Sequence, residues 1–238
     1  MAGHSKWANI RHKKGREDAK RGKAFTKLIK EITVVARTGG GSPDNNPRLR
    51  QLIDKAKEIN MPKENIERAI KKGTGELPGV NYEEINYEGY GPHGIAVFIE
   101  TLTDNKNRTV ADMRRLFSSK GGSLGESGSV SWMFERRGVI RAQDGSTTED
   151  ELLEKLLDFD IIDITKDENL FSIVCEIKSL ESVKQAVADL NLKIEAADLE
   201  WVPKTTTELS EKETGKAYEF LSALDDHDDV QNVYTNLA

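Results

Sequence analysis

The apolar positions between residues 23 and 75 recur at helical spacing. From Lys23 to Thr38 they fall at positions 25, 28, 29, 32, 35 and 36, which is the spacing of one helix face. The glycines at 39–41 end this stretch. A second helix is predicted from Pro47, and a third from about Pro62 to Gly73, each with its own apolar stripe. Because short amphipathic helices bury their stripes only against one another, we expect a three-helix N-terminal domain.

Strand-like alternation replaces this spacing after residue 80. Strands are predicted over 82–88 and 95–103, and a helix over 107–119. In "SVSWMF" the residues Val130, Trp132 and Phe134 alternate onto one side, which predicts another strand with a shared apolar face. The intervening "GGSLGESGS" is rich in glycine and is expected to be a flexible loop.

Residues 139–202 form a unit of their own. Runs of strand formers and amphipathic helices follow one another in the order β-α-β-β-α-β, which is the order of a ferredoxin-like domain. Ser146 and Glu149 are spaced as a capping box for the first of these helices.

The C-terminal tail is too short to fold alone. It predicts a helix over 211–225, opened by a Ser210–Glu213 capping box, and a strand over 230–236. Joined to residues 80–135, the tail completes an α/β domain into which the ferredoxin-like unit is inserted. The expected fold class is therefore α+β multidomain, with a basic arm at 1–22, a helical domain at 23–75, a discontinuous α/β middle domain at 80–135 plus 204–238, and an inserted ferredoxin-like domain at 136–203.

Charge divides the chain unevenly. The net charge is -6, yet residues 1–75 carry 12 Lys and 7 Arg against 8 acidic residues, so they are at +11 and the remainder is at -17. Between Lys6 and Lys30 there are ten basic and two acidic residues. Such asymmetry indicates an anion-binding segment attached to an acidic body.

Trp7 distinguishes this segment from a purely solvating tail. A tryptophan among cations can stack on nucleic-acid bases while Lys and Arg contact phosphates, or it can dock on the helical domain. The alternatives to a nucleic-acid arm are a disordered solubilising tail and an arm that binds an acidic protein. The candidate nucleic-acid contacts are Lys6, Trp7, Arg11, Lys13, Lys14, Arg16, Lys20, Arg21, Lys23, Lys27, Arg48 and Arg50.

Catalytic and metal motifs receive no specific support. "GYGPHG" matches a dinucleotide-binding pattern, but a strand follows it where a helix is needed, so a glycine turn is expected. The single Cys and four scattered His show no metal-ligand spacing, and "LDDHDD" at 224–229 is typical of a solvated helix end. We expect no cofactor, no metal and no enzymatic activity. With no apolar run long enough for a membrane span and no secretory signal, a cytoplasmic protein without membrane partners is expected.

Several long segments resemble one family in order along the chain. They are "MAGHSKWANIRHKK", "DAKRGKAFTKLIKEI", "NPRLRQLIDKAK", "MPKENIERAIKKG", "YEGYGPHGIAVFIETLTDNKNRT", "GGSLGESGSVSWMF" and "DDVQNVYTN". They resemble the YebC/PmpR family, which includes the mitochondrial translational activator of cytochrome c oxidase subunit I. The motifs are sparser in residues 139–202.

This resemblance implies a three-domain, non-enzymatic regulator that binds nucleic acid. Bacterial members are named as transcriptional regulators that bind promoter DNA, and others are linked to translation and the ribosome. A DNA-binding regulator is the first expectation. A ribosome-associated factor that contacts ribosomal RNA is the alternative, and an adaptor that binds proteins through the acidic domains is a third. The residues themselves favour neither DNA nor RNA, because basic charge gives affinity without sequence choice.

Overall fold

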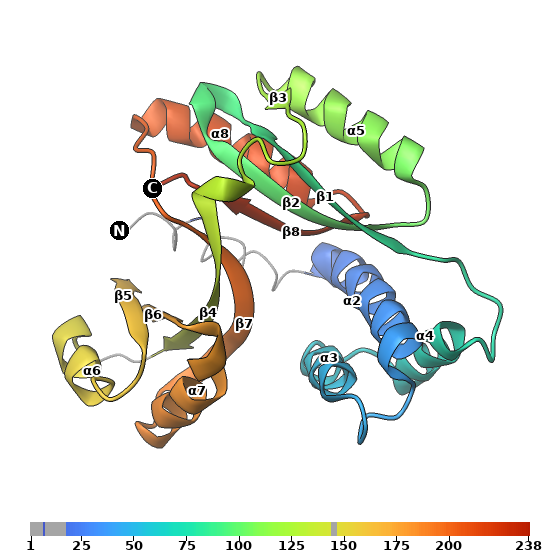
Figure 1. Ribbon diagram of the computed structural model, residues 1–238, viewed down its shortest axis with the longest axis horizontal. Helices are drawn as coiled ribbons and strands as arrows, with labels where there is room; N and C mark the ends of the chain where they lie inside the picture. Colours follow the sequence, from blue (N-terminus) through green and yellow to red (C-terminus); the bar gives the residue numbers. More distant parts are fainter. Residues whose placement is uncertain (1–6, 8–17, 144–146) are drawn as a thin grey trace.

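Three modules make up the molecule (Figure 1). The computed structural model describes residue 7 and residues 18–143 and 147–238, with side chains described at residue 7 and from residue 22 on. A helical domain, a middle domain and an inserted domain can be told apart in this view. The fold is α+β and multidomain with an N-terminal helical domain, as predicted.

The helical domain packs α2 (Asp18–Gly39) against α3 (Pro47–Glu58) and α4 (Lys63–Thr74). Its core contains Ile32, Leu49 and Leu52, which come from the predicted apolar stripes. Asn46 caps α3 by accepting a hydrogen bond from the Leu49 N–H, and its amide also donates to the carbonyls of Val35 and Gly40. One asparagine therefore caps α3 and holds the end of α2 beside it.

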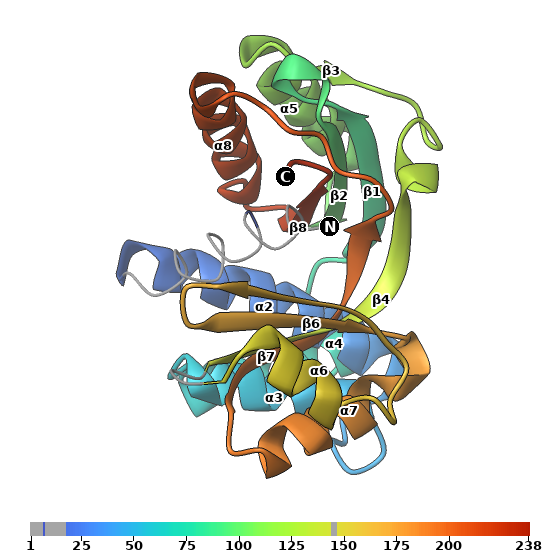
Figure 2. The same ribbon diagram turned by 90° about the vertical axis from the view of Figure 1, so that its left-hand side faces the viewer.

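The middle domain is a four-stranded sheet of order β3-β1-β2-β8. It contains β1 (Glu83–Tyr90), β2 (Ala96–Thr103), β3 (Ser123–Leu124) and β8 (Val230–Thr235), and β8 pairs antiparallel with β2. The helices α5 (Lys106–Ser119) and α8 (Glu211–Asp225) cover one face of this sheet (Figure 2). Between them Phe117 and Phe220 meet edge to face at 5.0 Å. The C-terminal helix and strand thus complete a domain begun more than 100 residues earlier.

The inserted domain is a second antiparallel sheet, of order β5-β6-β4-β7. Along the chain it reads β4 (Phe134–Gln143), α6 (Glu149–Lys155), β5 (Ile161–Asp167), β6 (Leu170–Cys175), α7 (Leu180–Asp189) and β7 (Lys193–Pro203). This is the predicted ferredoxin-like order. The predicted capping box is wrong: Thr148 and Glu151 form it at the start of α6, while Ser146 lies outside the described residues.

The predicted strand over "SVSWMF" is also wrong. Ser131–Met133 is a single 3₁₀ turn, and β4 begins only at Phe134. Val130 and Phe134 are buried, but Trp132 is 65% exposed. The turn rotates Trp132 away from the face that its two neighbours share.

A buried carboxylate explains why the chain turns here. The backbone N–H groups of Gly128, Val130 and Ser131 all donate to the Glu88 carboxylate, at 2.7 to 2.9 Å. Burial acts to raise the pKa of Glu88, but these hydrogen bonds outweigh it and hold the pKa below its ordinary value. The glycine-rich segment that was expected to be a flexible loop is therefore hydrogen-bonded to a buried carboxylate at its end, through Gly128, and it contains the short strand Ser123–Leu124.

Within the part of the chain that the structure describes, no helix is both long enough and apolar enough to cross a membrane.

Candidate nucleic-acid interface

Seven of the predicted contact residues cannot be placed as side chains. Five of them lie outside the described residues: Lys6, Arg11, Lys13, Lys14 and Arg16. Lys20 and Arg21 belong to the first turns of α2, but their side chains are not described. Trp7, Lys23, Lys27, Arg48 and Arg50 are described, and the structure assigns a place to each.

Trp7 is a core residue of the middle domain. It is 3% exposed, its ring stacks on Tyr218 of α8 with centroids 6.1 Å apart, and its Nε1 donates to the Val233 carbonyl of β8 at 3.2 Å. The indole has no free face on which a base could stack, and it does not dock on the helical domain. Both sequence-based interpretations of Trp7 are therefore wrong in this arrangement, and its role is to fasten the arm to the middle domain.

The lysines of α2 face the acidic end of α8. Lys23 donates to the Asp226 carbonyl at 3.0 Å, and Lys27 donates to the Asp225 carbonyl at 2.9 Å. Each also forms an ion pair with the carboxylate of the same residue. Cations at the C-terminal end of a helix are favourable because the last carbonyls are unsatisfied. The two predicted phosphate contacts thus serve in domain docking in this state.

This row of lysines ends in a buried ion pair. Lys30 Nζ lies 2.7 Å from the Asp229 carboxylate, which also accepts hydrogen bonds from Arg108 and Thr109 at 2.8 Å each. Burial acts to raise the pKa of Asp229, but the hydrogen bonds from Lys30, Arg108 and Thr109 outweigh it and hold the pKa well below its usual range. Part of the "LDDHDD" run therefore binds protein cations. Among the described residues, no group of three or more His, Cys, Asp or Glu could hold a metal ion.

Arg48 and Arg50 lie at the start of α3 and are both exposed. Arg48 is 3.5 Å from the Glu31 carboxylate, whereas Arg50 donates to the carbonyls of Pro43 and Asp44. Arg50 keeps its full charge toward solvent because its partners are neutral carbonyls. Of the described candidate residues, it is best placed to meet a phosphate.

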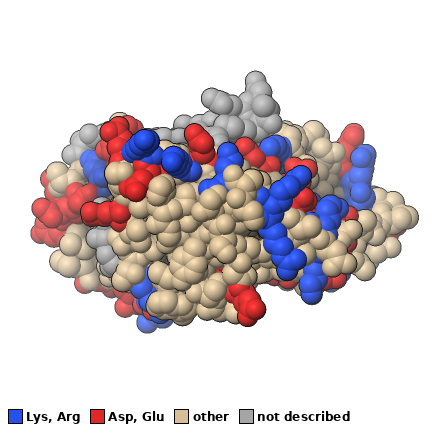
Figure 3. All heavy atoms as spheres, turned by 90° about the horizontal axis from the view of Figure 1, so that it is seen from above, with Lys and Arg blue, Asp and Glu red and all other residues tan. Residues whose placement is uncertain are grey.

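A basic surface on α5 escaped the sequence analysis. Figure 3 shows lysine and arginine side chains grouped on the side of α5. The helix and the residue that caps its C-terminal end expose Lys106, Arg114, Arg115 and Lys120. The signal was present in "KNRTVADMRRLFSSK", but it was read only for its apolar face.

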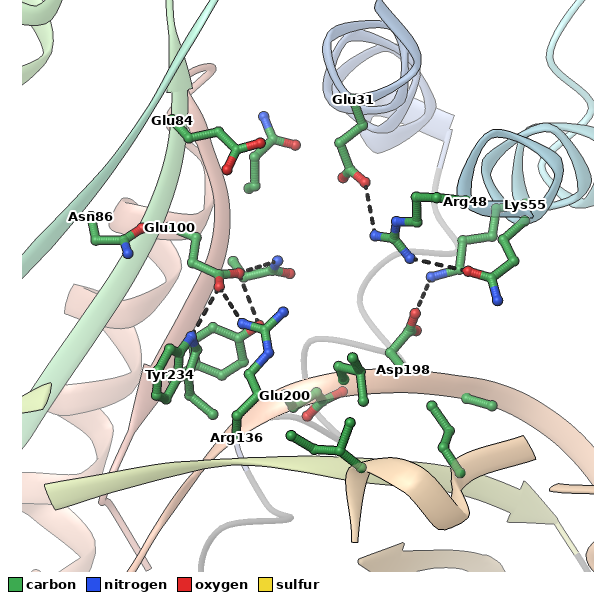
Figure 4. A pocket seen from close by; sticks show the side chains of 18 of the residues that line it. Glu31, Arg48, Lys55, Glu84, Asn86, Glu100, Arg136, Asp198, Glu200 and Tyr234 are labelled. Atoms are coloured by element: carbon green, nitrogen blue, oxygen red, sulfur yellow. Dashed lines mark hydrogen bonds and ion pairs between the residues drawn. The ribbon is translucent and has the colours of Figure 1, made fainter. Parts of the chain in front are cut away.

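A polar cleft of about 730 Å³ lies where the three modules meet (Figure 4). Glu31 and Arg48 face it from α2 and α3, Glu100 and Tyr234 face it from β2 and β8, and Asp198 faces it from β7. Lys55 of α3 forms an ion pair with Asp198 across the cleft, which joins the helical and inserted domains. The carboxylates along its wall make the cleft unsuited to a phosphate backbone.

Family comparisons cover almost the entire chain. Residues 5–76 match the model described as TACO1/YebC protein N-terminal domain, and residues 82–237 match the model described as TACO1/YebC second and third domain.

Similar proteins come from several bacteria. A "Probable transcriptional regulatory protein" of Desulfosudis oleivorans is 52% identical over 236 residues, which are 99% of this chain and 96% of that protein. A protein with the same name from Chloroherpeton thalassium is 54% identical over 238 residues, which are 100% of this chain and 95% of that protein. The crystal structure of the conserved hypothetical protein Aq1575 from Aquifex aeolicus superposes with a TM-score of 0.83 at 46% identity, covering 93% of this chain and 91% of that one. The chain therefore belongs to the TACO1/YebC family, many of whose members are named as transcriptional regulatory proteins.

Proposed function

We propose that this protein is a non-enzymatic regulatory factor that binds nucleic acid, in the first place a transcriptional regulator that binds DNA. The N-terminal arm makes the main phosphate contacts, and exposed cations of the helical domain such as Arg50 extend them. The middle domain keeps the arm oriented, and the carboxylate-lined cleft between the domains stays away from the phosphates.

The observation that carries this proposal is the concentration of charge at one end of an acidic chain. Residues 1–75 are at +11, and four cations of the arm, Arg11, Lys13, Lys14 and Arg16, lie in sequence between Trp7, in the core of the middle domain, and the start of α2. A basic segment fastened at both ends loses less conformational entropy on binding than a free tail does. The names of the relatives support regulation as the outcome of that binding.

Binding to a short DNA duplex is expected to depend steeply on salt. If the protein engages six or more phosphates, affinity falls by about a thousandfold between 50 and 200 mM salt, because counterions are released from DNA. Replacing Lys13, Lys14 and Arg16 together by Gln should reduce the slope of log affinity against log salt by about 2.7. Fluorescence anisotropy at several salt concentrations measures both quantities.

The matched control removes the same charge elsewhere. Lys155, Lys184 and Lys193 lie on α6, α7 and β7 of the inserted domain, away from α8, on which the arm is fastened, and their replacement by Gln should leave the slope unchanged. Equal losses in the two triple variants, or a flat salt response of the unmodified protein, would contradict the proposal.

Contact with unpaired RNA is a second candidate, and Trp132 favours it. The indole is 65% exposed and its Nε1 donates to the Ser129 carbonyl at 3.2 Å. The turn that carries it is hydrogen-bonded to Glu88, so a large aromatic face is presented in a fixed orientation. Such a face stacks on any unpaired base.

Trp132→Ala is expected to weaken binding to single-stranded RNA by about fivefold to a hundredfold, since stacking one base contributes about 1–3 kcal/mol. Affinity for duplex DNA should not change, because paired bases offer no free face. Leu157→Ala removes another exposed apolar side chain, on the inserted domain, and serves as the control. If Trp132→Ala weakens both polymers equally or neither, the RNA candidate fails.

A further inference from the structure

The exposed side of α5 carries cations that stay unpaired among the described residues. Residues 106–120, which are α5 and the residue that caps it, contain five Lys or Arg and one Asp, a net charge of +4, whereas residues 76–238 as a whole are at -17. Lys106, Arg114 and Lys120 are exposed, and none of their side chains forms a hydrogen bond or an ion pair with a described residue. Their charge is therefore open to an anionic ligand.

Arg114 differs in this respect from the other arginines after residue 75. Four of those each form an ion pair with a carboxylate, at 2.6 to 2.8 Å: Arg108, Arg136, Arg137 and Arg141. Arg115 pairs with Asp112 at 3.2 Å, but its side chain is 77% exposed. Because such a surface pair contributes little free energy, Arg115 can exchange Asp112 for another anion. Two adjacent guanidinium groups are thus available on α5.

The fold turns this side of α5 toward solvent. The helix buries Thr109, Met113 and Phe117 in the middle domain. Side chains at helical spacing on the other side are exposed: Asn107, Ala111, Arg114 and Ser118. Apart from Arg114 these side chains are short, so an extended ligand can lie close to the helix. α5 is about 21 Å long, and it lies at the outer edge of the middle domain in Figure 1.

α5 is fixed to the same core as the N-terminal arm. Trp7 belongs to the apolar cluster that also contains Met113 and Phe117 of α5. The attachment point of the arm and the basic side of α5 are therefore held by one domain. Two binding surfaces on one body hold a ligand more tightly than either surface alone, provided that the ligand reaches both.

We propose that α5 is a second phosphate-binding surface and that it holds the same DNA molecule as the arm. This inference rests on the DNA binding proposed above and extends the contact to the middle domain. Arg114 and Arg115 donate hydrogen bonds to phosphate oxygens, and Lys106 and Lys120 reach phosphates near the two ends of α5. Arginine suits this role because its planar guanidinium can donate two hydrogen bonds to one phosphate. Such contacts position the DNA without reading its sequence.

Arg114→Gln combined with Arg115→Gln tests this surface in the full chain. Anisotropy titrations with a DNA duplex at several salt concentrations should show the slope of log affinity against log salt reduced by about 1.8, because two phosphate contacts are lost. Lys155→Gln combined with Lys184→Gln removes the same charge from α6 and α7 of the inserted domain and should leave the slope unchanged. Circular dichroism checks that both double variants are folded.

The arm variant separates a failure of the α5 contact from a failure of the proposed function. An unchanged slope in the α5 variant, or an equal change in its control, overturns the α5 contact. If replacement of Lys13, Lys14 and Arg16 by Gln still lowers the slope in that case, DNA binding by the arm stands and only the α5 surface is wrong. A flat salt response of the unmodified protein overturns both proposals.

The distance between α5 and bound DNA can be tested by a tethered cleavage reagent. Cys175 is the single cysteine of the chain and is buried, and burial raises the pKa of its thiol to about 11. An iron chelate therefore labels a cysteine introduced at exposed Ser118 selectively. The labelled Ser118→Cys variant should cut the bound duplex, whereas the labelled Ser182→Cys variant, with its label on α7, should not. No cutting from Ser118→Cys, or equal cutting from both variants, overturns the proposal.

Discussion

Asp229→Asn is expected to destabilise the protein by about 3–5 kcal/mol, the cost of breaking a buried ion pair by removing one partner. Asp229 is buried and is shared by Lys30 of the helical domain and by Arg108 and Thr109 of the middle domain. Asparagine keeps the shape of the side chain but leaves Lys30 as a buried, uncompensated cation. Urea unfolding followed by circular dichroism measures the loss.

An exposed ion pair serves as the reference for the loss of stability expected in Asp229→Asn. Asp54→Asn breaks the pair with Lys57 on α3, where both side chains are well exposed. That change should cost less than about 1 kcal/mol, because water screens exposed pairs. If Asp229→Asn costs no more than Asp54→Asn, the cluster of Asp229 with Lys30, Arg108 and Thr109 does not hold the helical and middle domains together.

The contribution of Asp229 should also depend on pH in one direction. Its pKa in the folded protein is held below the value of about 3.9 that an unfolded Asp has. The stabilisation is therefore fully present above about pH 4 and is lost as pH falls toward the lowered pKa. The stability difference between the unmodified protein and Asp229→Asn should be constant between about pH 5 and 7 and should shrink below about pH 4. Other acidic groups titrate equally in both proteins, so they cancel in this comparison.

Periodicity predicted most of the fold because each element carries its own apolar stripe. Even the return of the C-terminal helix and strand to the middle domain could be predicted, since a helix and a strand left over at the end of a chain need a sheet to join, whereas the pairing of β8 with β2 came only from the structure. The failure at Trp132 has a local cause. Its sequence alternates like a strand, but the Glu88 carboxylate accepts hydrogen bonds from the backbone N–H groups of Val130 and Ser131, which a strand would use for pairing. The alternation of apolar and polar residues around Trp132 does not reveal that the Glu88 carboxylate, far away in the sequence, is buried beside them.

The candidate site was harder to predict because its parts come from separate modules. The lysines at 23, 27 and 30 and the acidic run near residue 226 were both visible in the sequence, but only the fold brings them together. The count of charged residues identified the basic arm, yet it could not tell which cations form ion pairs with the protein's own carboxylates.

Trp7→Ala is expected to destabilise the middle domain by about 3–5 kcal/mol, the usual cost of truncating a large buried aromatic residue. The change removes the stacking contact with Tyr218 and the hydrogen bond to the Val233 carbonyl, and it leaves a cavity between α8 and β8. Urea unfolding measures the loss, and Trp7→Phe should recover most of it because a phenyl ring refills the core without the hydrogen bond.

Trp7→Ala also tells apart two roles that Trp7 could have in nucleic-acid binding. In one it only fastens the arm to the middle domain, and in the other it contacts a base directly. If Trp7 only fastens the arm, Trp7→Ala leaves every phosphate-binding cation in place, so affinity falls through added arm entropy while the salt slope stays the same. At a temperature where the variant is folded, anisotropy titrations at several salt concentrations give both numbers. Unchanged stability together with a large loss of affinity would instead place Trp7 on a base. The burial of the indole makes the first result the expected one, since a side chain enclosed by α8 and β8 must leave the core before it can stack on anything else.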